Sequence, residues 1–268
     1  MLNDSFLQQL VDITLEAGAV IMEIYKTDFD VAHKADRSPV TEADERAEAL
    51  ILERLKVIAP DIPVIAEESV AAGRVPEIGD RFFLVDPLDG TKEFLNRNGD
   101  FTVNIALVEG GVPRTGVVYA PAKNDVYAAS PEAGAVRGSV DTEGKVAFSP
   151  ISVRQVPEDG MVVVASRSHM TDETKEFVEK FKVADLVSAG SSMKFCRVAA
   201  GDADLYPRLG RTMEWDTAAG DAVLRGAGGK VLAMDGKPLA YGKRNQADDT
   251  DFANSWFVAA GPVDPFAG

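Results

Sequence analysis

Five short apolar runs follow one another between residues 64 and 129, each separated from the next by polar or turn-forming residues. Short runs rich in β-branched and aromatic side chains are typical of strands. They cover residues 64–66, 82–85, 101–108, 116–119 and 126–129. Glycine pairs and prolines between such runs mark turns, as at Gly110 and Pro121. The spacing therefore predicts strands joined by antiparallel hairpins.

Two amphipathic helices are predicted before these strands. Residues 4–26 repeat apolar side chains every three or four positions, which indicates one buried helix face. A second helix is expected to begin at Thr41 and to end before Pro60. Thr41 and Asp44 have the spacing of a capping box, with Asp in place of the usual Glu.

The second half of the chain predicts another group of helices and strands. Residues 132–155 are rich in glycine, serine and polar side chains, so we expect a hairpin there and the junction between two lobes, 1–150 and 151–268. Further strands are predicted over 161–165, 205–206 and 256–260, and helices over 171–182, 191–200 and from Asp216 or Thr217 to 226. Helices alternating with groups of strands indicate a layered α+β fold in a single domain of 268 residues.

Charge and cysteine content exclude several classes of protein. The chain has 28 basic and 43 acidic side chains, a net charge of −15, which repels nucleic acids and anionic membranes. The single cysteine, Cys196, excludes an internal disulfide and a cysteine-rich zinc site, and it favours a reducing cytoplasmic compartment. Neither a signal peptide nor a run of about 20 apolar residues is recognised. We therefore expect a small-molecule partner and no transmembrane segment.

The strongest local motif is Asp86-Pro-Leu-Asp89-Gly-Thr91, directly after a predicted strand. Pro87 fixes one backbone angle and Gly90 permits a sharp turn, so both aspartates and the Leu88 carbonyl could converge on one hard cation. The alternative is a turn whose aspartates bond only their own backbone.

Three further acids are candidates for the same site. Glu67 follows another predicted strand. It could instead lie in a solvated loop with no part in a site. Asp216 lies where a helix should begin and could act only as its N-cap. Asp44 lies in the first turn of its helix, where backbone donors stabilise a carboxylate in any case.

The sequence contains no persuasive motif for other kinds of catalysis. The two histidines, His33 and His169, lie in polar segments and form no recognisable serine or cysteine triad. No phosphate-binding glycine motif of nucleoside-triphosphate or dinucleotide folds is present. The carboxylates that remain suit magnesium, which prefers oxygen ligands.

Four segments in order resemble the lithium-sensitive inositol monophosphatase superfamily: Val40–Asp44, Ala66–Ser69, Asp86–Thr91 and Glu214–Gly220. The longer motif Asp86–Phe94, with Ser166–His169 and Tyr206–Arg208, is similar to its 3′(2′),5′-bisphosphate nucleotidase branch. The resemblance implies a layered αβαβα sandwich of the inositol monophosphatase/fructose-1,6-bisphosphatase type. It also implies magnesium-dependent removal of the 3′-phosphate from adenosine 3′,5′-bisphosphate by water, with two or three Mg²⁺ ions and no phosphoenzyme.

The resemblance also assigns residue roles. Metal ligation is implied for Glu67, Asp86, the Leu88 carbonyl, Asp89 and Asp216. Asp44 and Thr91 match the pair that orients the attacking water, and Glu67 joins them as a catalytic residue. Substrate contacts are implied for Leu88, Asp89, Gly90, Thr91, His169, Gly190, Ser191, Ser192, Lys194, Arg208 and Asp216.

The substrate and the cellular setting leave alternatives open. Inositol phosphatases carry an acid after the tyrosine near position 206, where this chain has Pro207-Arg208, and arginine suits a second phosphate. Arg208 could instead pair with Asp202 or Asp204. The alternative functions are an inositol or sugar phosphatase, distinguished by Lys92-Glu93-Phe94 and Arg208, and a non-catalytic metal-binding module. A monomer or homodimer is expected. The expected location is the cytoplasm, and the resemblance to relatives that attach to the inner membrane leaves peripheral attachment to its cytoplasmic side as an alternative.

Overall fold

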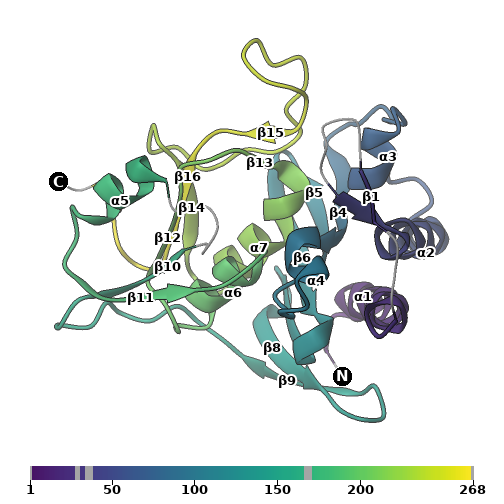
Figure 1. The fold of residues 1–268 in the computed structure, drawn as a ribbon, viewed down its shortest axis with the longest axis horizontal. Helices are drawn as coiled ribbons and strands as arrows, with labels where there is room; N and C mark the ends of the chain where they lie inside the picture. The colour runs from purple at the N-terminus through teal and green to yellow at the C-terminus, as the bar shows by residue number, and fades with distance from the viewer. Residues whose placement is uncertain (1, 28–30, 34–38, 166–170, 267–268) are drawn as a thin grey trace.

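The computed structural model describes residues 2–27, 31–33, 39–165 and 171–266. The described helices and strands form five layers, which follow one another across Figure 1 as helices, sheet, helices, sheet and a single helix. On one side, α1 (Ser5–Tyr25) and α2 (Glu42–Ile58) cover the larger sheet. The helices α6 (Met193–Ala199) and α7 (Glu214–Gly226) lie between the two sheets. On the far side, α5 (Asp172–Val178) packs on the smaller sheet.

The larger sheet has seven strands in sequence order. Its strands are β3 (Val64–Ala66), β4 (Arg81–Asp89), β5 (Thr102–Glu109), β6 (Val112–Ala120), β7 (Asp125–Ser130), β8 (Gly134–Val140) and β9 (Val146–Pro150). β3 runs parallel to β4, and every later neighbour is antiparallel, as the hairpin pattern predicted. A short 3₁₀ helix, η1 (Pro121–Lys123), turns the chain between β6 and β7.

The smaller sheet has five strands in the order β11-β10-β12-β16-β14. Their bounds are β10 (Met161–Ala165), β11 (Val183–Ser188), β12 (Leu205–Arg208), β14 (Lys230–Ala233) and β16 (Phe257–Ala260). Two small pairs complete the described strands: β1 (Val31–His33) with β2 (Pro39–Thr41), and β13 (Thr212–Met213) with β15 (Ala253–Asn254). The short helices α3 (Glu67–Ala71) and α4 (Thr91–Leu95) follow β3 and β4.

Small side chains allow α7 to lie directly against the larger sheet. A Cβ on Gly116 of β6 would lie 2.7 Å from the Ala219 carbonyl and from Ala222 Cβ, so only glycine permits this approach. The largest buried cluster joins side chains of both sheets to α6 and α7, including Val118, Ala129, Val223 and Phe257. Residues on both sides of position 150 therefore share this core.

The structure corrects several predicted boundaries. β4 continues to Asp89 instead of ending at Val85, so the two aspartates of the motif lie within the last part of the strand. α7 begins at Glu214, which makes Asp216 its third residue and not its N-cap. The helix predicted over 171–182 ends at Val178 and is followed by β11, a largely exposed edge strand without an alternating apolar pattern. Among the helices that the structure describes, none is long and apolar enough to span a membrane.

Candidate active site

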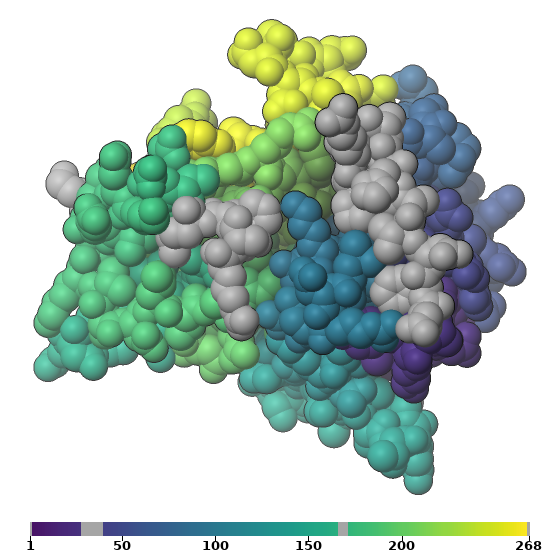
Figure 2. All heavy atoms as spheres, in the orientation of Figure 1, coloured from purple at the N-terminus to yellow at the C-terminus, as the bar shows by residue number. Residues whose placement is uncertain are grey.

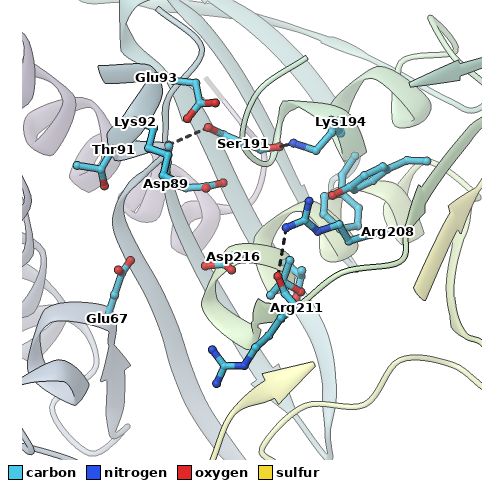
Figure 3. Close-up of a pocket in the computed structure, with 15 residues that line it drawn as sticks. Glu67, Asp89, Thr91, Lys92, Glu93, Ser191, Lys194, Arg208, Arg211 and Asp216 are labelled. Atoms are coloured by element: carbon cyan, nitrogen blue, oxygen red, sulfur yellow. Dashed lines mark hydrogen bonds between the residues drawn. The ribbon is translucent and has the colours of Figure 1, made fainter. Parts of the chain in front are cut away.

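A cleft of about 390 Å³ lies where the end of β4, the loop before α6, the end of β12 and the start of α7 meet (Figure 3). Acidic side chains line one side, and Lys194, Arg208 and Arg211 line the other. In Figure 3, Glu67, Asp89 and Asp216 point towards the same space. The cleft can therefore place cations and a multiply charged anion next to each other.

Glu67, Asp86 and Asp216 form the acidic centre of this cleft. Each offers one carboxylate oxygen, and these three oxygens all lie within 4.8 Å of one another. Burial, together with the nearby charges of Asp89 and Glu67, raises the pKa of Asp216 to about 8. Closely spaced carboxylates with little access to water are stabilised by a divalent cation, so the donor set fits a hard metal ion.

Local backbone geometry positions two of these carboxylates. The register between β4 and β5 shifts between Asp86 and Asp89, and this bulge turns the strand end. Asp86 Oδ1 accepts a hydrogen bond from the Leu88 amide at 3.0 Å. Asp216 Oδ2 accepts one from the Met213 amide at 2.8 Å, at the start of α7. Capping and metal ligation are compatible here because each carboxylate has a second oxygen.

Asp89 also lines the cleft but lies outside the cluster of three carboxylates found among the described residues. Its Oδ2 accepts hydrogen bonds from the Ser192 amide at 2.7 Å and from Asn104 Nδ2 at 3.4 Å. Burial raises the pKa of Asp89 to about 6, and the nearby charge of Lys194 opposes that shift. One oxygen of Asp89 is thus directed to the loop before α6.

Asp44 and Thr91 come together although 47 residues separate them. Thr91 Oγ1 lies 3.4 Å from Asp44 Oδ1 and 3.5 Å from the Leu88 carbonyl. The Thr41 amide and hydroxyl hold the other Asp44 oxygen at 2.8 and 2.7 Å. The predicted capping box is therefore confirmed, and it leaves Asp44 buried with one oxygen facing Thr91.

The loop of Gly190, Ser191 and Ser192 connects the end of β4 to the start of α7. Ser191 Oγ lies 2.8 Å from the Asp89 carbonyl, and Ser192 Oγ donates to the Asp216 carbonyl at 2.6 Å. Gly90 adopts φ 94°, and a Cβ there would lie 2.4 Å from Ser191 Oγ. The left-handed backbone and the close Ser191 side chain therefore favour glycine at this position.

The basic side of the cleft is built on β12 and α6. Lys194 Nζ donates to the Ser191 carbonyl at 2.6 Å, and burial lowers the pKa of Lys194 to about 8. Arg208 Nη2 donates to the Arg211 carbonyl at 3.1 Å. Its Nε is buried without a hydrogen-bond partner among the residues that the structure describes. Such a buried donor is suited to an anionic ligand.

In the part of the chain that the structure describes, Arg208 pairs with neither Asp202 nor Asp204. Asp202 Oδ2 lies 3.1 Å from Arg197 Nη1, and Asp204 Oδ2 lies 2.8 Å from Arg154 Nη2. The other predicted substrate residue, His169, lies outside the described residues, as does the rest of Ser166–His169.

Arg211 is a cleft residue that the sequence did not single out. Asp249 Oδ1 lies 3.0 Å from Arg211 Nη2, and Thr250 Oγ1 lies 2.8 Å from the same nitrogen. Both partners belong to the segment between β14 and β15, which projects from the body in yellow in Figure 2. No motif marks this contact, because its partners are 38 and 39 residues apart in the chain.

The sequence model of the inositol monophosphatase family matches residues 2–256. The chain belongs to the inositol monophosphatase family. A Shigella flexneri relative named 3′(2′),5′-bisphosphate nucleotidase CysQ is 46% identical over 244 residues, covering 89% of this chain and 94% of the relative. A relative of the same name from Escherichia coli strain K12 is 45% identical over 240 residues, with the same coverage of both chains.

Solved structures agree with this family. The crystal structure of CysQ from Bacteroides thetaiotaomicron, described as a bacterial member of the inositol monophosphatase family, has a TM-score of 0.79 and 38% identity and covers 98% of this chain and 99% of its own. A Thermotoga maritima IMPase has a TM-score of 0.76 and 26% identity. The match covers 96% of this chain and 92% of the Thermotoga chain. The predicted enzyme family and its layered sandwich fold are thus confirmed.

Proposed function

We propose that this protein is a magnesium-dependent phosphomonoesterase that hydrolyses the 3′-phosphate of adenosine 3′,5′-bisphosphate to give AMP and phosphate. The observation that carries the proposal is the division of the cleft, with carboxylates on one side and Lys194, Arg208 and Arg211 on the other. Such a cleft suits a ligand with one phosphate at the metal centre and a second phosphate beyond it. The names of the curated relatives support the same substrate. The corresponding 5′-phosphosulfate is a second candidate substrate.

The donor set supports magnesium as the cofactor, with two or three ions during turnover. We propose that Glu67, Asp86, Asp89, Asp216 and the Leu88 carbonyl hold them, because all five offer hard oxygen ligands at one end of the cleft. When bound, magnesium supplies positive charge that admits a dianionic phosphate and increases the acidity of water.

Thr91 and Asp44 orient the attacking water in this proposal. The Thr91 hydroxyl donates to Asp44, which leaves the lone pairs of its oxygen to accept a hydrogen from water. Asp44 accepts the proton that Thr91 passes on, while Glu67 faces the same space from α3. Holding the nucleophile in line with phosphorus lowers the entropic part of the barrier.

Lys194, Arg208 and Arg211 bind the phosphate that is not hydrolysed. The loop of Gly190, Ser191 and Ser192 contacts the nucleoside, and the backbone of Gly90 and Thr91 contacts the reacting phosphate. An inositol phosphate has one phosphate and several hydroxyl groups, so it offers no second phosphate to Lys194 and Arg208. The basic side of the cleft therefore favours the bisphosphate over the inositol ester.

A substrate panel tests the proposal. Phosphate release is measured from adenosine 3′,5′-bisphosphate and from inositol 1-phosphate, each with Mg²⁺ and with EDTA. We expect Mg²⁺-dependent release that is faster from the bisphosphate. Equal or faster turnover of inositol 1-phosphate would favour an inositol phosphatase, and no release from any phosphate ester would favour a non-catalytic metal-binding module.

Lithium is expected to inhibit the enzyme, because it competes for a metal position with one charge fewer. The inhibition should weaken as the Mg²⁺ concentration rises.

A further inference from the structure

Glu48 is a buried carboxylate that lies outside the cleft, on α2. It is four residues after Asp44, so the two side chains share one face of the helix. Only 3% of Glu48 is exposed. Its Oε2 accepts a hydrogen bond from the Glu68 amide at 2.7 Å, and its Oε1 accepts one from Ser69 Oγ at 2.7 Å. Both contacts reach the first turn of α3.

The start of α3 depends on this contact from another helix. The residue that precedes α3 is Ala66, which has no polar side chain to bond the first backbone donors. Glu48 fills that role from 20 residues away in the chain. The first residue of α3 is Glu67, whose carboxylate belongs to the acidic cluster.

A second observation separates Glu48 from a residue that only fills space. Burial raises the pKa of Glu48, and its hydrogen bonds to Ser69 and Glu68 oppose that shift. An ionised buried side chain is unfavourable unless hydrogen bonds compensate it, so these two bonds determine where the carboxylate and α3 lie relative to each other.

We propose that Glu48 is a positioning residue that fixes α3 and thereby holds Glu67 for metal binding. The inference rests on the metal site of the proposed function. One face of α2 then supports both halves of the chemistry, because Asp44 contacts Thr91 and Glu48 contacts the helix that carries Glu67. Residues that orient a metal ligand affect metal affinity without touching the metal.

Three substitutions separate geometry from charge and from general stability. Glu48→Ala removes both hydrogen bonds. Glu48→Gln keeps them without the charge, since its amide oxygen can accept from Glu68 and its amide nitrogen can donate to Ser69 Oγ. Glu45→Gln is the matched control, because Glu45 is an exposed acid on the same helix.

The readout is the midpoint Mg²⁺ concentration for binding, the Kd obtained by fitting the rise of Tm with Mg²⁺ concentration, measured without substrate. For Glu48→Ala we expect this concentration to rise about 10- to 100-fold, and for Glu48→Gln and Glu45→Gln less than about threefold. The kcat of Glu48→Ala should recover at saturating Mg²⁺. A purely structural role would lower Tm equally at every Mg²⁺ concentration and leave the midpoint unchanged.

Each outcome decides the inference. A wild-type midpoint in Glu48→Ala overturns it. If that variant does not fold, Ser69→Ala replaces it: loss of one bond should raise the midpoint several-fold, and an unchanged midpoint overturns the inference. A wild-type protein whose Tm does not respond to Mg²⁺ overturns the metal site of the proposed function and the inference with it, whereas a normal wild-type response with an unaffected variant overturns the inference alone.

Discussion

Like charges crowd the acidic end of the cleft, and this has a measurable consequence for Asp216. Its pKa is raised from 3.8 to about 8, chiefly by burial. The folded metal-free protein therefore binds more protons than the unfolded chain between these pH values, so its stability falls as pH rises through that window. Asp216→Asn should reduce this loss, raise the Tm in EDTA at pH 8 and abolish turnover.

Thermal unfolding from pH 4 to 9 in EDTA, with wild type and Asp216→Asn side by side, measures this effect. An unchanged dependence of Tm on pH in the variant would contradict the charge argument. Turnover above about a tenth of the wild-type rate at saturating Mg²⁺ would contradict metal ligation, because loss of such a ligand costs several kcal/mol of transition-state stabilisation.

The position of Arg208 predicts an effect on substrate choice. If it binds the phosphate that is not hydrolysed, Arg208→Ala should lower kcat/KM for adenosine 3′,5′-bisphosphate by about 10- to 1000-fold, mainly through KM. The kcat/KM for adenosine 3′-monophosphate should fall much less. Arg197→Ala is the control, because Arg197 pairs with Asp202 at the surface. Equal losses on both substrates would leave Arg208 with no role in selecting a bisphosphate.

Single residues also mark how far the sequence could predict the site. Asp86, Asp89 and Thr91 lie in one continuous motif, so their proximity is encoded within six residues. Arg211 and Glu48 carry no such local signal. Each acts through a partner at least 20 residues away, and only packing of the folded chain brings these pairs together.

At the level of elements, the loop before α6 must approach the β4–β5 connection closely. A Cβ on Gly190 would lie 2.5 Å from the Asp100 carbonyl and 2.6 Å from Asp100 Cβ. Gly190→Ala should displace the loop, weaken its bonds to Asp89 and Asp216, and destabilise the protein by about 1–3 kcal/mol. We expect a lower Tm together with a lower kcat/KM.

Gly79→Ala is the matched control for this substitution, because no atom beyond its chain neighbours lies within 4 Å of its added Cβ. Denaturant unfolding and steady-state kinetics on both variants measure the two effects. Wild-type values in Gly190→Ala would show that the loop can move without affecting the cleft.

Elements differ in how clearly their sequences predict them. α1 and α2 are long and periodic, and β5 to β7 are apolar runs joined by short turns, so the pattern identifies each of them. The helices α3 and α4 have five residues each, too short for a periodic signal. β11 has no fully buried residue, so its strand comes from pairing with β10 and not from its own apolar pattern.

On the scale of the whole molecule, α7 joins the two predicted lobes. It packs on β5, β6 and β7 of the larger sheet and on β14 of the smaller one. The acidic cluster is divided in the same way, since Glu67 and Asp86 precede position 150 and Asp216 follows it. We therefore propose that residues 1–150 and 151–268 unfold together as one domain.

The two tryptophans allow this cooperativity to be measured. Trp215 and Trp256 both lie after position 150, so their fluorescence reports on the second lobe. Leu10 is fully buried in α1, far along the chain from either. Leu10→Ala should destabilise its own region by about 2–5 kcal/mol, as buried leucine truncations do. If the lobes unfold together, the tryptophan transition shifts by the same amount.

Urea titrations followed by tryptophan fluorescence and by far-ultraviolet circular dichroism measure both lobes in one sample. Coincident midpoints that move together in Leu10→Ala are expected. Val57→Ala, at an α2 position that is 74% exposed, is the control and should move neither midpoint. A fluorescence midpoint that stays in place while the dichroism midpoint falls would mean that the lobes unfold separately. In that case the shared core around α7 would be too weak to couple the two halves of the metal site.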